Sequence, residues 1–124
     1  MNSEQKLREI ANNENGETLK KYVAEYWLDE LDNYTDNRKK AVQDWYNDLM
    51  KGGCQNGMIS SLIYYKDTHA FFDKYSNEIF ELVDEFEDSL GEPMKIKDDR
   101  KNFYAWFGFE EMAREIAEEI GIEA

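Results

Sequence analysis

The chain is poor in residues that interrupt helices and in residues that build most catalytic and metal centres. Its 124 residues include one proline, one cysteine and one histidine. Since proline breaks helix interiors, long segments are free to be helical. One cysteine excludes an internal disulfide, and with one histidine it cannot supply a Cys₂His₂ or His₃ zinc site. No phosphate-cradling loop of the G-x-x-x-x-G-K-S/T type is present. We therefore expect no cofactor and no bound metal.

Long apolar runs and positive charges are also scarce. No apolar stretch approaches the ~20 residues of a membrane-spanning helix, and the polar first residues lack the apolar core of a signal peptide. Lys and Arg number 15 against 28 Asp and Glu, giving a formal net charge of −13. Nucleic acids and anionic membranes are recognised mainly through cations, so neither is an expected partner. With the lone cysteine, these absences predict a soluble protein of a reducing cytoplasm.

Core-forming side chains, by contrast, are plentiful. Hydrophobic residues make up 41% of the chain and aromatic residues 15%, which separates it from disordered acidic proteins. A chain of this length forms one domain and buries enough surface to fold without metal or disulfide. We expect a single compact acidic domain over residues 1–124.

Apolar residues recur at helical spacing along most of the chain. The clearest segment runs from Leu19 to Leu31, and glycines predict helix ends at Gly52, Gly91 and Gly121. The remaining helices are expected over residues 3–11, 37–52, 68–75, 76–90 and 99–120. The sequence thus predicts an all-α fold of five or six helices with little or no β structure. Residues 1–16 are expected to be mobile.

Two short segments leave the secondary structure open. Gly57–Tyr65 fits a short helix, which we favour, but its apolar run also fits a strand. Met94–Lys97 alternates apolar and basic residues and is compatible with an extended segment. The expected core contains five large aromatic side chains: Trp27, Trp45, Phe86, Trp106 and Phe107.

The excess negative charge lies in the second half of the chain. Residues 1–66 carry 11 acids and 9 bases, whereas residues 67–124 carry 17 acids and 6 bases. Helical spacing gathers eight of these acids into two rows: Glu81, Asp84, Glu85 and Asp88, then Glu111, Glu115, Glu118 and Glu119. Few lysines interleave, although like charges at such spacing cost a few tenths of a kcal/mol per pair. The rows are either solvated surface or a polyanionic surface that imitates a nucleic-acid backbone.

A catalytic interpretation of the sequence depends on His69, the only histidine of the chain. Asp67 and Asp73 lie close to it in sequence, and Ser60, Ser61 and Cys54 lie upstream as nucleophiles for a Ser–His–Asp or Cys–His pair. No nucleophile-elbow sequence is present, and a histidine that only bonds a nearby aspartate is the interpretation that we favour. We predict no catalytic residue and no enzymatic activity.

Aromatic residues offer a different kind of surface. Adjacent aromatic side chains on a helix point about 100° apart, so core packing does not cover all of them. Tyr64, Tyr104 or Phe109 are therefore candidates for an exposed patch that contacts a protein partner.

Two stretches resemble a small, largely uncharacterised family carried by bacteriophages, prophages and mobile elements. They are GCQNGMISSLIYYKDTHAFFDKY and GEPMKIKDDRKNFYAWFGFEE, within a resemblance that covers residues 53–121. The family implies no established activity. It suggests a mobile-element origin, and by analogy with other small acidic proteins of such genomes it suggests an inhibitor of host defence, such as an anti-CRISPR or anti-restriction protein.

Two functional hypotheses follow. In the first, the protein is a phage-type inhibitor in the bacterial cytoplasm that binds a basic host protein, a CRISPR effector or a restriction enzyme, through the two acidic rows. In the second, it is a structural or adaptor protein that acts through an exposed aromatic surface as a homodimer. Salt distinguishes them, because it weakens binding through carboxylates far more than apolar binding.

Overall fold

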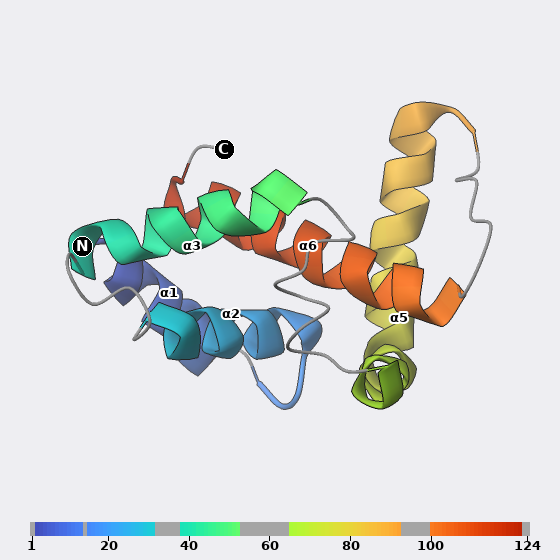
Figure 1. Ribbon diagram of the computed structural model, residues 1–124, viewed down its shortest axis with the longest axis horizontal. Helices are drawn as coiled ribbons and strands as arrows, with labels where there is room; N and C mark the ends of the chain where they lie inside the picture. The colour runs from blue at the N-terminus through green and yellow to red at the C-terminus, as the bar shows by residue number, and fades with distance from the viewer. Residues whose placement is uncertain (1, 14, 32–37, 53–64, 93–99, 123–124) are drawn as a thin grey trace.

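The computed structural model of the chain is all-α (Figure 1), as predicted. It describes residues 2–13, 15–31, 38–52, 65–92 and 100–122, which form five helices and no strand. The helices are α1 (Ser3–Asn13), α2 (Leu19–Glu30), α3 (Arg38–Gly52), α5 (Tyr65–Leu90) and α6 (Arg100–Ile120). Of the two segments left open by the sequence, all but Tyr65 lie outside the described residues.

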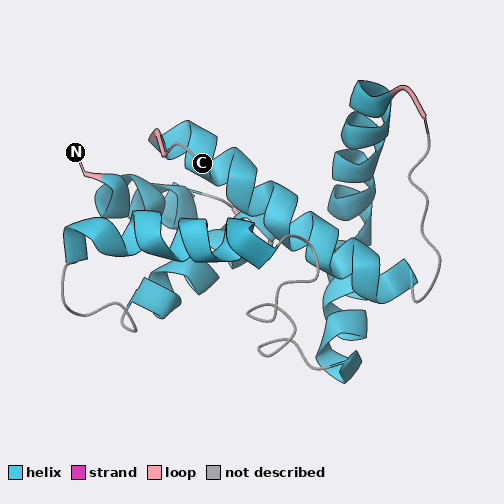
Figure 2. Cartoon of the chain, turned by 45° about the horizontal axis from the view of Figure 1, so that its top comes forward, coloured by secondary structure: helices cyan, strands magenta, loops and turns pink. Residues whose placement is uncertain are grey.

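Helix α6 is the centre of the fold and packs against each of the other four helices. Figures 1 and 2 show it running the length of the molecule, with α1, α2 and α3 beside one half and α5 crossing the other. This position explains why α6 buries many apolar side chains. Its buried apolar side chains are Ala105, Phe107, Phe109, Met112, Ala113, Ile116, Ala117 and Ile120.

A cluster of aromatic rings joins four of the helices. Trp27 of α2 stacks on Trp45 of α3 with ring centroids 4.6 Å apart. Tyr26 forms an edge-to-face pair with Phe109 of α6, with ring centroids 5.2 Å apart. Tyr22 extends the cluster to Phe71 of α5 at 5.0 Å. The burial of Phe109 means that the prediction of an exposed Phe109 is wrong. Phe109 lies three, four and seven residues before Met112, Ala113 and Ile116, so helical spacing places it on the buried apolar face of α6.

The predicted aromatic core is confirmed with one adjustment. Trp27, Trp45 and Phe107 are buried, whereas Phe86 and Trp106 are half-buried and pack against the edge of the core. Phe86 of α5 and Phe107 of α6 form an edge-to-face pair with ring centroids 5.2 Å apart, which contributes to the packing of the two helices.

Helix α5 changes direction at Tyr75, where φ is −112° and ψ is 19°. The sequence predicted two separate helices meeting between Tyr75 and Ser76, and the structure joins them across this kink. Figure 1 shows the first part of α5, in green, end-on, and the second part, in yellow, upright. The second part therefore reaches away from α1, α2 and α3. The predicted helix end at Gly91 is confirmed, and the φ angle of this glycine is 78°.

At the other end of the chain, residues 1–16 include helix α1. Leu7, Ile10 and Ala11 are buried in the common core, and α1 packs chiefly against α2. The expected mobility of residues 1–16 remains a prediction, but this segment contributes to the core.

Candidate functional site

The first acidic row lies on the second part of α5. Glu81, Asp84, Glu85 and Asp88 are all exposed or half-exposed, on the side of the helix opposite Ile79 and the other residues that it buries. Asp88 lines a hollow together with Glu87, Gly91 and Glu92. The prediction that this row faces outward is confirmed.

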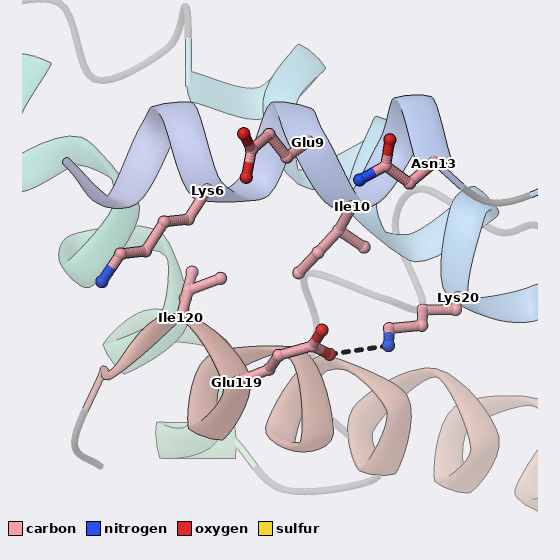
Figure 3. A pocket seen from close by; sticks show the side chains of 7 residues that line it. All are labelled: Lys6, Glu9, Ile10, Asn13, Lys20, Glu119 and Ile120. Atoms are coloured by element: carbon pink, nitrogen blue, oxygen red, sulfur yellow. Dashed lines mark ion pairs between the residues drawn. The ribbon is translucent and has the colours of Figure 1, made fainter. Parts of the chain in front are cut away.

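The second row divides along α6. Glu115, Glu118 and Glu119 are exposed, but Glu111 is half-buried. Glu119 points toward α2 and forms an ion pair with Lys20 at 2.6 Å. Figure 3 shows this pair beside a hollow between α1 and α6, of about 290 Å³, which Lys6, Glu9, Ile10, Asn13 and Ile120 also line. Glu119 therefore belongs to a different surface from the rest of its row.

The two rows meet where α5 crosses α6. A hollow of about 220 Å³ is lined by Leu82 and Glu85 of α5 together with Glu111, Arg114, Glu115 and Glu118 of α6. We call this set the acidic hollow. Four of the eight predicted residues are thus brought together from two helices. Glu81, Asp84 and Asp88 continue the acidic surface along α5, and Glu119 does not take part.

Arg114 is a member of the hollow that the sequence analysis did not single out. Its guanidinium lies 3.2 Å from Oε1 of Glu110 and 3.6 Å from Oε1 of Glu111, and it also lies 3.5 Å from Sδ of Met50 on α3. Spacings of three and four residues along α6 place these groups on adjacent turns. Arg114 therefore offsets part of the negative charge at one edge of the hollow.

Glu110 is the second residue that the sequence analysis missed. It is only 5% exposed, and its Oε2 atom is buried without a hydrogen-bond partner among the described residues. A signal was present, since Ala113 and Ala117 follow Glu110 at helical spacing and both are buried. The pairing with Arg114 explains how the carboxylate is tolerated, because a buried charge needs a partner.

Burial raises the pKa of the Glu111 carboxyl above its usual range. Arg114 acts in the opposite direction and Glu110 adds a smaller upward effect. The folded protein therefore holds a proton on Glu111 more readily than the unfolded chain does. The other carboxylates of the hollow are better exposed.

Of the candidate catalytic side chains, only that of Asp73 lies within the described part of the structure. The side chains of Asp67 and His69, although on α5, lie outside the described part of the structure, as do Cys54, Ser60, Ser61 and Tyr64. Asp73 is exposed. In the described ranges, no group of three or more His, Cys, Asp or Glu side chains is arranged to hold a metal ion. Among the same residues, no helix is long and apolar enough to cross a membrane.

Comparison with known proteins identifies a family. The profile of a domain of unknown function, DUF7222, matches residues 5–122, so the chain belongs to this family. The match includes α1, α2 and α3 as well as the segment from residue 53 to 121. No curated protein and no solved structure matches the chain significantly.

Proposed function

We propose that this DUF7222 protein is an acidic, phage-encoded inhibitor of a host defence nuclease, of the anti-CRISPR or anti-restriction type. In this proposal it binds the effector in the bacterial cytoplasm and covers the effector's nucleic-acid-binding surface by charge mimicry. It acts by binding rather than by catalysis, and it needs no cofactor. Its partner is a basic protein, not a nucleic acid or a membrane.

The observation that carries the proposal is the convergence of the two acidic rows. Glu85 from α5 and Glu111, Glu115 and Glu118 from α6 line one hollow, and three further exposed acids continue along α5. Such an array of carboxylates complements the charge of a groove lined with Lys and Arg, which otherwise binds phosphates. The net charge of −13 supports rapid, steered association with such a groove.

A phage-protection assay tests the proposal. Bacteria with a restriction or CRISPR system express the chain, and the efficiency of phage plaquing is measured. The test variant reverses Glu81, Asp84, Glu85 and Asp88 to lysine. A matched control reverses four acids on α2 and α3: Glu25, Asp29, Asp44 and Asp48.

If the chain inhibits the defence system, phages should plaque efficiently on cells that express the wild type or the control and poorly on cells that express the test variant. Because both variants change net charge equally, this result would assign the effect to the α5 surface rather than to overall charge. The binding of the effector should weaken steeply with salt. Equal plaquing with both variants, or no inhibition of any system in a panel of defence systems, would contradict the proposal.

The alternative function, an adaptor that forms a homodimer through aromatic residues, is favoured by one observation. Phe80 on α5 is 42% exposed. Sedimentation of the wild type as a concentration-dependent dimer, reduced in Phe80→Ala, would support the adaptor function. The chemistry around Phe80, however, fits a different occupant.

A further inference from the structure

Phe80 is an exposed aromatic side chain that is held in place by two other rings. Its ring forms an edge-to-face pair with Phe72 and another with Tyr104, and the ring centroids lie 5.6 Å and 5.2 Å apart, respectively. Phe72 is buried, which ties the cluster to the core. A large apolar side chain that is exposed and already ordered loses little conformational entropy on binding, and rigid aromatic side chains of this kind often dominate the energy of protein interfaces.

The charge along the second part of α5, which carries Phe80, is of one sign. From Ser76 to Leu90, helix α5 carries acids and no base. Asp84 and Glu87 lie four and seven residues after Phe80, which places them on the same face of the helix. Asp84 is exposed and Glu87 half-buried. The face therefore presents an apolar anchor followed by two carboxylates along about two turns of helix.

We propose that this face of α5 docks a basic amphipathic helix of a partner protein. In this arrangement an apolar side chain of the partner covers Phe80, and its Lys or Arg side chains reach Asp84 and Glu87. A second copy of the chain is disfavoured, because two such faces would bring like charges together. The inference rests on the proposed function in one respect, that the partner is basic, and it adds an apolar contact that charge mimicry alone does not require.

A pair of synthetic peptides tests the inference. The first is a helical leucine–lysine peptide of about 14 residues, or about four turns, with leucines on one face and lysines on the other. The second has the same composition in an order that gives no apolar face. Fluorescence anisotropy of each labelled peptide measures its affinity for the full chain at low and moderate salt.

We expect the wild type to bind the amphipathic peptide at least about tenfold more tightly than the scrambled one. Phe80→Ala should remove most of that preference. Leu90→Ser, which alters the other exposed large hydrophobic side chain of the described residues, should keep it. Asp84→Lys, at an exposed position that leaves the ring cluster intact, should weaken binding of both peptides and lower the salt dependence. Circular dichroism confirms that each variant is folded.

The outcomes separate this inference from the proposed function. Equal affinity for the two peptides, or an unchanged preference in folded Phe80→Ala, would overturn the inference but leave charge mimicry standing. If neither peptide binds the chain, the inference is also overturned. Self-association of the wild type that Phe80→Ala abolishes would assign the face to a second copy instead. If the preference depends on Phe80 but the chain inhibits no defence system, the docking surface would be supported and the proposed defence role would be rejected.

Discussion

Glu78 and Leu19 are joined by a hydrogen bond between residues that lie far apart in the chain: the backbone N–H of Leu19 donates to Oε2 of Glu78 at 3.0 Å. Leu19 is the first residue of α2, where backbone N–H groups have no partner within the helix. Thr18 satisfies another of these groups, since its hydroxyl accepts from Lys21 N at 3.1 Å. The start of α2 is therefore capped both by its own sequence and by α5.

Removing the Glu78 carboxylate should destabilise the protein. We expect Glu78→Ala to lower the free energy of unfolding by about 1 kcal/mol, because a helix-end donor loses an ionised acceptor. Glu78→Gln keeps an oxygen acceptor without the charge and should lose less. Urea unfolding measures both variants, with Glu81→Ala, at an exposed position on the same helix, as the control. A loss in Glu78→Ala no larger than that in the control would contradict this role.

Gly108 of α6 lies directly against Ile79 of α5. A Cβ atom placed there would lie 2.6 Å from Cγ1 of Ile79, a fully buried side chain. We expect Gly108→Ala to destabilise the protein, because overpacking of about 1–3 kcal/mol exceeds the helix-propensity gain of about 1 kcal/mol. In an Ile79→Ala background the same change should be neutral or stabilising, and a double-mutant cycle by urea unfolding measures this coupling. Additive effects would show that the two positions do not compete for space.

Glu111 should make stability depend on pH in an identifiable way. Its pKa is raised in the folded state by burial, so the folded protein binds this proton more tightly than the unfolded chain. Stability from this group is complete below the unfolded pKa and is lost as pH rises through the folded pKa. Glu111→Gln should therefore stabilise the protein at neutral pH, by less than about 1 kcal/mol, because the loss of the contact with Arg114 offsets part of the gain. The gain should vanish below pH 4.5, the ordinary pKa of a glutamate carboxyl. Glu115→Gln, at an exposed position, is the control, and a gain independent of pH would argue against burial as its cause.

The buried tyrosines predict a second pH effect, at the alkaline end. Burial raises the pKa of Tyr26, Tyr46 and Tyr75 above the ordinary value of 10.0. These phenols stay neutral in the fold, so stability should fall as pH rises above about 10. Spectrophotometric titration should resolve two classes among the eight tyrosines, with the late class ionising together with unfolding. A single transition near pH 10 in the folded protein would contradict the burial of these phenols.

The secondary structure was largely predictable because it depends on local spacing. The apolar period placed α2 and the two parts of α5, and glycine placed the helix ends at Gly91 and Gly121. The same spacing places Phe109 on the apolar face of α6, three, four and seven residues before Met112, Ala113 and Ile116, so its burial was also predictable. The burial of Glu110 was less predictable, because a carboxylate at the margin of an apolar face is buried only where a neighbouring helix covers it, and the amphipathic period of one helix does not report its neighbours.

The acidic rows also combine features that local spacing predicts with features that tertiary packing decides. Helical spacing identified the outward face of α5, where Glu81 and Asp84 lie exposed. It could not place Glu119 against Lys20, nor Glu85 in one hollow with Glu111. Those relationships depend on the crossing of two helices, which tertiary packing decides.

The central position of α6 has a consequence for biosynthesis. The ribosome makes α1, α2, α3 and α5 before the helix that all of them pack against. Until residues 100–120 leave the ribosome, the nascent chain holds exposed aromatic side chains of α2 and α3 without the surface that covers them. Such intermediates expose apolar surface and are the usual substrates of chaperones. Ribosomes stalled before α6 should therefore carry a protease-sensitive chain, and release of the complete helix should convert it to a resistant one in a single step.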